Sequence, residues 1–68
     1  AKDDAKAAEW YQKAAEQGNA FAQYKLGEMY DKGEGVTKDA AKAVEWWQKA
    51  AAQDNDAAKE SLKSLRAK

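Results

Sequence analysis

The chain repeats itself at a spacing of 36 residues. Residues 2–20 read KDDAKAAEWYQKAAEQGNA, residues 38–56 read KDAAKAVEWWQKAAAQDND, and 13 of these 19 positions are identical. A period of this length is typical of arrays of helical hairpins, in which each unit packs on a neighbour to cover its apolar face. After residue 20 the similarity fades, and Tyr24 stands opposite Glu60. The more polar second copy indicates a capping helix at this end of the array.

Capping residues divide the chain into four predicted helices. We expect them to run from about residue 4 to 17, 20 to 32, 40 to 53 and 56 to 67. The expected N-caps, whose side-chain oxygens accept bonds from free amides of the first turn, are Asp3, Asn19 and Asp39. Gly18 and Gly33 end the first two helices in the left-handed conformation. Asp54 replaces glycine after the third helix, so we expect a less regular turn there.

Large apolar side chains are few, which assigns most of them to the core. Ala fills 17 of the 68 positions, and 13 larger apolar residues remain, seven of them aromatic. Ordering a chain of this length costs on the order of 100 kcal/mol, so most of these rings must be buried. We expect Val36 to fold back from the loop at residues 33–38 onto this core. Gly27 in mid-helix costs about 1 kcal/mol relative to Ala, which indicates that another helix approaches its backbone closely.

The composition excludes several classes of function. Twelve Lys and Arg balance twelve Asp and Glu, so the chain offers no net attraction to nucleic acid or an anionic membrane. It has no Cys or His, which removes disulfides, thiol chemistry and the usual ligands of zinc or copper. No run approaches the ~18 apolar residues of a membrane span, so we expect a soluble protein.

Catalytic and cofactor motifs are also missing. Gly33 and Gly35 form only G-x-G inside a short loop, without the strand or the third glycine of a dinucleotide site. The segment 31–39 has glycines at the third and fifth positions, where a calcium loop needs oxygen ligands. Ser61 and Ser64 have no His to act as a base. The sequence therefore predicts no enzyme, no cofactor and no metal site.

The middle of the chain resembles the Sel1-like repeat, a relative of the tetratricopeptide repeat. Residues that match the family pattern A-x-x-x-L-G-x-x-Y-x-x-G-x-G-V, D-x-x-K-A and W-x-x-K-A-A are Ala22, Leu26, Gly27, Tyr30, Gly33, Gly35, Val36, Asp39, Lys42, Ala43, Trp46, Lys49, Ala50 and Ala51. The resemblance implies an all-α fold, a right-handed superhelix (solenoid) of antiparallel helix pairs. The first helix (A) of each pair would form the concave wall.

The resemblance also implies a division of the chain. It would be a single domain, 1–68, with its four helices in the order B-A-B-cap. The parts would be a half repeat at 3–18, a full repeat at 19–54 and a capping helix at 55–68.

The concave wall of related arrays maps onto the second predicted helix. Its candidate peptide-binding residues, spaced by three and four so that they share one face, are Phe21, Tyr24, Glu28 and Asp31. Two rings beside two carboxylates are suited to an extended peptide with apolar and basic side chains. The alternative is that the rings pack against neighbouring helices while the carboxylates are solvated.

The first predicted helix carries a second candidate surface. Trp10 and Tyr11 stand one repeat before Trp46 and Trp47, a recurrence that favours packing between repeats over a stacking platform for bases or a sugar. The helix that would precede Trp10 in the family pattern is missing, so we expect part of its face to be bare. Such a patch favours self-association, as a homodimer or by end-to-end stacking.

The predicted function is a non-catalytic helical-repeat scaffold with a role in folding and assembly. Eleven of the 12 basic residues are Lys, Ile is absent and charge is balanced, a composition typical of a consensus-derived or engineered minimal array. The alternative is an adaptor for protein–protein interactions that binds a peptide on the second helix. The expected partners are therefore proteins or peptides, with no nucleic acid and no membrane.

Overall fold

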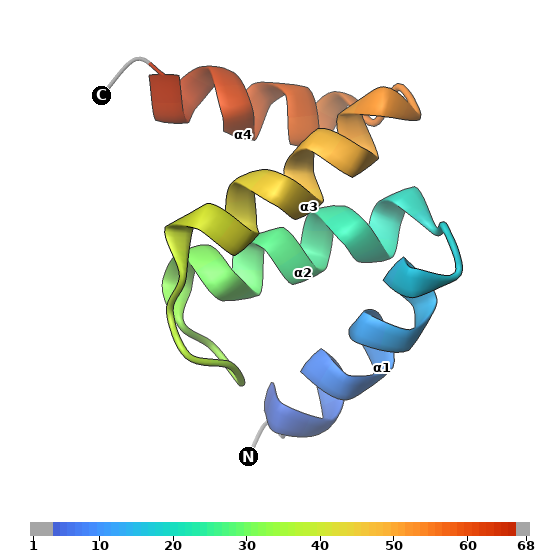
Figure 1. The fold of residues 1–68 in the computed structure, drawn as a ribbon, viewed down its shortest axis with the longest axis vertical. Helices are drawn as coiled ribbons and strands as arrows, with labels where there is room; N and C mark the ends of the chain where they lie inside the picture. Colours follow the sequence, from blue (N-terminus) through green and yellow to red (C-terminus); the bar gives the residue numbers. More distant parts are fainter. Residues whose placement is uncertain (1–3, 67–68) are drawn as a thin grey trace.

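The computed structural model describes residues 4–66 and contains four α-helices in that range, with no strand. The helices are α1 (Asp4–Glu16), α2 (Ala20–Lys32), α3 (Ala40–Ala52) and α4 (Asp56–Arg66). Figure 1 shows them stacked in chain order, from α1 at the bottom to α4 at the top, and each packs on the next. The predicted all-α fold of four helices is confirmed. The expected cap at Asp3 and the predicted end at residue 67 lie outside the described residues.

The turns after α1 and α3 have the same geometry. Gly18 and Asp54 both adopt the left-handed conformation, with φ of 94° and 65°. The amides of Asn19 and Asn55 each donate to the carbonyl five residues earlier, at 3.1 Å. The prediction of a less regular turn at Asp54 was therefore wrong, because a short polar side chain tolerates this conformation. Lys59 also pairs with the Asp54 carboxylate, at 3.1 Å.

Side-chain caps begin α2, α3 and α4. The oxygens of Asn19, Asp39 and Asn55 accept hydrogen bonds from the amide three residues later, at 2.9, 3.1 and 2.8 Å. Each bond satisfies a donor that has no partner inside the helix. The caps predicted at Asn19 and Asp39 are confirmed, and Asn55 adds an equivalent one at the start of α4.

The loop between α2 and α3 reaches back to the start of α1 (Figure 1). Gly35 has φ of 76°, and a Cβ atom there would overlap the backbone carbonyl of Asp4. Only glycine combines this conformation with such a close approach. Val36 is half-buried in the same loop. The loop thus ties the full repeat to the helix before it.

Small and aromatic side chains build two apolar layers. One layer joins α1 to α2 through the buried residues Ala15, Ala22 and Leu26. The other joins α3 to α4 through Ala43, Trp47, Ala50 and Ala58. Tyr30 packs against both layers. Because alanine is so frequent at these helix–helix contacts, the helix backbones approach one another closely. The few rings fill the remaining space.

The close approach predicted at Gly27 is confirmed. A Cβ atom on Gly27 would lie 2.6 Å from two atoms of the Trp47 indole, so the ring occupies the space that a side chain would need. The indole Nε1–H also donates to the carbonyl of Tyr24 at 3.2 Å. Trp47 is 4% exposed and therefore links α3 to α2 by packing and by a hydrogen bond.

Candidate functional site

A groove of about 470 Å³ lies between α2 and α4. It forms because both helices pack on α3 and make few contacts with each other. The residues that line it are Tyr24, Glu28, Asp31, Lys32, Trp47, Ala57, Glu60, Ser61, Ser64 and Leu65. Its volume falls within the range of ~300–1,000 Å³ that is usual for ligand sites, but its walls are more polar than most.

Apolar side chains from α3 and α4 also line the groove. Trp47 is held there by its bond to the Tyr24 carbonyl, and Leu65 is half-buried beside the same layer. Ala57 adds a small apolar side chain from α4. The indole is fixed by packing and by a hydrogen bond, and because Trp47 is 4% exposed it presents only a small surface to the groove.

The α2 wall carries a carboxylate that is already paired. The Tyr24 hydroxyl donates to Glu28 at 3.3 Å, and Lys25 Nζ lies 3.4 Å from the same carboxylate. Lys32 Nζ lies 3.9 Å from its other oxygen. These contacts neutralise much of the charge of Glu28 and hold its side chain along the helix.

Two further carboxylates line the groove without partners. Asp31 on α2 and Glu60 on α4 form no hydrogen bond or ion pair with any other residue among 4–66. The lining thus contains three carboxylates against the single ammonium of Lys32, which is itself engaged by Glu28. The groove therefore has a negative field, which opposite walls contribute.

The structure brings together three of the four residues predicted to bind a peptide. Tyr24, Glu28 and Asp31 line the groove, whereas Phe21 does not. Phe21 lies one turn nearer the start of α2, where its ring centroid is 6.3 Å from that of Tyr11. The α4 wall was not predicted from the sequence, because the residues of α4 have the polar pattern of a capping helix. The repeat does indicate this wall, since Glu60 stands 36 residues after Tyr24 and is therefore its equivalent on α4.

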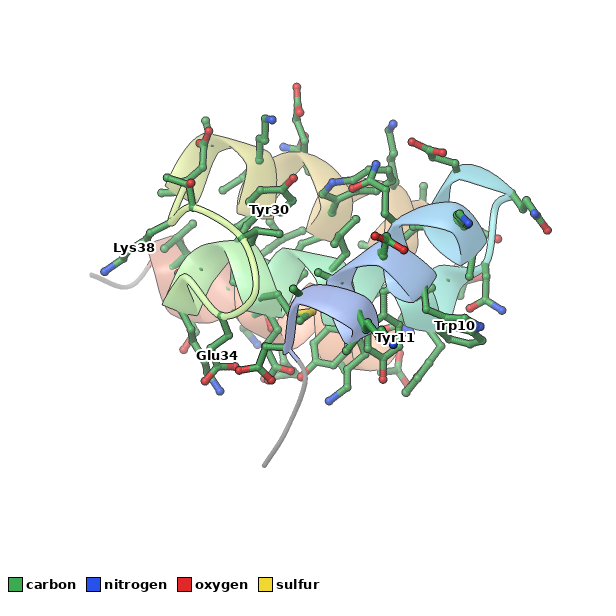
Figure 2. The ribbon with its side chains drawn as sticks, turned by 90° about the horizontal axis from the view of Figure 1, so that it is seen from below. Trp10, Tyr11, Tyr30, Glu34 and Lys38 are labelled. Carbon is green, nitrogen blue, oxygen red and sulfur yellow. The ribbon has the colours of Figure 1, made fainter. Side chains whose placement is uncertain are left out.

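A second surface, the aromatic patch, consists of Trp10, Tyr11 and Phe21. The ring centroids of Trp10 and Tyr11 are 5.3 Å apart, and the two side chains lie next to each other below α1 in Figure 2. Trp10 is 64% exposed and Phe21 is 56% exposed. The prediction that part of Trp10 is bare is confirmed. The patch differs from the groove in consisting of aromatic rings in edge-on contact.

The Gln23 side chain joins three helix ends through hydrogen bonds. Gln23 is 5% exposed, and its Nε2 donates to the Ala15 carbonyl at 3.1 Å. Its Oε1 accepts a bond from Gln53 at 3.0 Å. This side chain stabilises the stack and was not identified from the sequence.

The part of the chain that the structure describes shows no metal-binding cluster and no membrane span. In residues 4–66, no three His, Cys, Asp or Glu side chains are grouped closely enough to hold a metal ion. None of the helices in that range has the length and hydropathy to cross a bilayer.

The repeat matches a known protein family. The family model described as Sel1 repeat matches residues 1–19 and 20–55. No curated protein matches the sequence. The chain is similar to a solved Sel1 repeat protein from Oxalobacter formigenes, with a TM-score of 0.92 and 45% identity over 96% of this chain.

A second similar structure is c5321, a protective antigen present in uropathogenic Escherichia coli strains that displays an SLR fold. Its TM-score is 0.85, with 46% identity over 87% of this chain. The chain spans 27% of the length of the first protein and 13% of the second.

Proposed function

Because the chain belongs to the Sel1 repeat family, we propose that it is a non-catalytic scaffold that folds as a minimal stacked array and presents surfaces to other proteins. Proteins of this family are helical-repeat scaffolds that often mediate protein interactions. The observation that supports the proposal is the position of Trp46 and Trp47, which pack into the apolar layers that join the helices. Their rings serve assembly of the stack and leave the outer surfaces for contacts.

Trp fluorescence tests whether the chain is a scaffold alone. Trp47 lines the groove, so its emission responds to an occupant there. Titration with peptides of unrelated sequence is expected to give no saturable change for a scaffold without a peptide site. A saturable change in emission that is also seen at a lower protein concentration contradicts that outcome and favours an adaptor.

We also propose that the sequence is an idealised or engineered array. The support is the balance of charge, the excess of Lys over Arg and the high content of Ala. Idealised helical proteins are typically very stable, so we expect a thermal midpoint above about 90 °C. A midpoint between about 45 and 65 °C, usual for natural domains from mesophiles, contradicts this origin.

Peptide binding in the groove is the second candidate function. It is supported by the volume of the groove and by the position of Tyr24, Glu28 and Asp31 on one wall. Ser64→Tyr fills the groove from an exposed position, so the fold is expected to be retained. This variant is expected to lose any saturable peptide response. Binding that is unchanged in Ser64→Tyr contradicts the assignment to the groove.

Self-association through the aromatic patch is a third candidate. End-to-end stacking would seat α1 on α4, where Lys63 occupies the position equivalent to Gly27. A lysine there obstructs the close approach that Trp47 makes on Gly27, so a symmetric pair of α1 faces is favoured over stacking. Sedimentation equilibrium is expected to show dimers at high concentration that Trp10→Lys abolishes. A monomer at millimolar concentration contradicts the proposal.

A further inference from the structure

We infer that α1 binds a helix of a different protein chain, and that this helix carries glycine and glutamine where α2 has Gly27 and Gln23. The inference rests on the scaffold function proposed above and states what one surface of the scaffold binds. It is carried by the contact between α2 and α3, because α1 repeats the α3 side of that contact.

Three residues form the α3 side of this contact. The Ala43 carbonyl lies 3.1 Å from the position that a Cβ atom on Gly27 would take. Trp46 packs against the apolar layer that α1 and α2 share. Gln53, in the turn after α3, donates from its side-chain amide to Gln23 at 3.0 Å. The contact therefore combines a close backbone approach, an indole and an amide hydrogen bond.

The first helix has the same residue types at the equivalent positions. We call these residues the α1 ridge; they stand 36 residues before Ala43, Trp46 and Gln53 and are Ala7, Trp10 and Gln17. Their spacing places them on one helix face. Ala7 is half-buried, whereas Ala43 is 1% exposed. Trp10 is largely exposed, whereas Trp46 is half-buried.

The α1 ridge is thus the α3 side of the contact without the helix that covers it. In Figure 1, α1 lies at the end of the stack, and α2 packs on it from one side. The Gln17 side chain is exposed and has no hydrogen-bond partner within residues 4–66. Helix faces of this kind are commonly covered by an amphipathic helix whose residues fit between the exposed side chains.

The repeat specifies what the covering helix must carry. At the position of Gly27 a side chain would meet the Ala7 backbone and the Tyr11 ring, which stand where Ala43 and Trp47 stand in the α2–α3 contact. Glycine is therefore required for the same close approach. At the position of Gln23, an amide oxygen accepts a bond from Gln17, as Gln23 accepts one from Gln53.

A second copy of this chain does not offer such a helix. Its α2 is already packed between α1 and α3. Its α4 carries Lys59 and Lys63 at the positions equivalent to Gln23 and Gly27. A lysine obstructs the close approach and has no acceptor for the Gln17 amide. The helix that fits the α1 ridge therefore comes from a different chain.

Three peptides test the recognition. The first is residues 19–35 of this chain, acetylated and amidated, which contains α2 with its N-cap Asn19 and its C-cap Gly33. The second and third are the same peptide with Gly27→Leu or with Gln23→Leu. Binding is followed by the indole N–H resonances of the labelled 68-residue chain, since the peptides contain no tryptophan. The unchanged peptide is expected to give a saturable shift of Trp10.

The substituted peptides are expected to bind more weakly for different reasons. Leucine forms helix more readily than glycine, so a peptide with Gly27→Leu that still binds at least about tenfold more weakly does so because the close approach is obstructed. Gln23→Leu is expected to weaken binding about threefold or more through loss of one hydrogen bond. The Trp47 indole, which already donates to the Tyr24 carbonyl, is expected not to shift.

Variants of the chain locate the binding. Trp10→Lys is expected to weaken the unchanged peptide about tenfold or more, because the exposed indole is the largest side chain of the ridge. Glu9→Lys is the matched control: Glu9 is exposed on α1, and its equivalent Glu45 stays exposed beside the α2–α3 contact. It is expected to leave the affinity unchanged.

The outcomes separate this inference from the scaffold function. Equal or tighter binding of the Gly27→Leu peptide, or binding that Trp10→Lys leaves unchanged, overturns the inference. A Trp10 shift that follows protein concentration but not peptide assigns the ridge to a second copy and also overturns it. The scaffold function is tested in the free chain: it fails if the Trp47 indole N–H exchanges with solvent as fast as that of Trp10.

Discussion

Trp46 is half-buried between helices, whereas Trp10, its equivalent one repeat earlier, is 64% exposed. Trp46 packs against the layer formed by Ala15, Ala22 and Leu26, and its ring lies 4.6 Å from the Lys49 ammonium. Trp10 touches Tyr11 alone among the rings. The residues around the two tryptophans are nearly identical, so the difference arises from which helices lie beside them. Burial at this position is a property of the stack.

Substitution at these two equivalent positions should separate the two environments. Trp46→Ala leaves a void against a packed layer and is expected to lower the free energy of unfolding by about 2–4 kcal/mol. Trp10→Ala removes a largely solvated ring and is expected to change it by less than about 1 kcal/mol. Chemical denaturation followed by circular dichroism measures both. Equal losses for the two variants would show that Trp10 is packed to the same degree.

Gly27→Ala is expected to reverse the usual effect of this substitution. In an exposed helix the change stabilises by about 1 kcal/mol. Here the new Cβ meets the Trp47 ring, which the Tyr24 carbonyl holds in place, so we expect a net loss of about 1–3 kcal/mol. Gly27→Leu should cost several kcal/mol. Ser64→Ala, at an exposed position of α4, is the control for helix propensity. A stabilised Gly27→Ala variant would rule out the close contact.

Loss of the Gln23 side chain is expected to weaken the whole stack. Gln23→Ala removes two hydrogen bonds of a buried side chain, to the Ala15 carbonyl and to Gln53, and leaves that carbonyl with the bond from the Gly18 amide. Such changes cost about 1–3 kcal/mol. A double-mutant cycle with Gln53→Ala should give a coupling energy of about 0.5–1.5 kcal/mol. Strict additivity would mean that the two amides act independently.

Asp54→Gly is expected to stabilise the chain by up to about 1 kcal/mol. Residue 54 has φ of 65°, a conformation that costs a non-glycine residue about 1–2 kcal/mol. The gain is reduced by the loss of the exposed pair with Lys59, which is worth little. Gly18→Ala, at the equivalent turn, should destabilise by a similar amount. Thermal unfolding of the two variants tests this assignment. The midpoint must rise for Asp54→Gly and fall for Gly18→Ala.

Much of the fold was predictable because it depends on residues that are close in the chain. The caps at Asn19 and Asp39 act within three residues, and Gly33 ends α2 through its own conformation. The repeat indicated that the helices stack, and it predicted that Trp47 packs between helices. The mid-helix glycine at position 27 even indicated where two helices would approach most closely.

The candidate site was only partly predictable. Tyr24, Glu28 and Asp31 share a helix face by spacing alone, which the structure retains on one wall of the groove. The opposite wall lies on another helix, where Glu60 is 29 or more residues away from these side chains in the chain. No local sequence pattern predicts the distance between two helices that both pack on a third helix.

The sequence by itself determined the helices, their caps and the fact that they stack, since these follow from hydrogen bonds within a few residues and from a repeated apolar pattern. The tertiary structure alone decided which equivalent residues are buried. It separated Phe21 from the groove and placed it beside Tyr11, buried Gln23 between helix ends, and brought residues of α2 and α4 to one groove. These outcomes depend on the offset between packed helices, which is set by how the few large rings fit against many alanines.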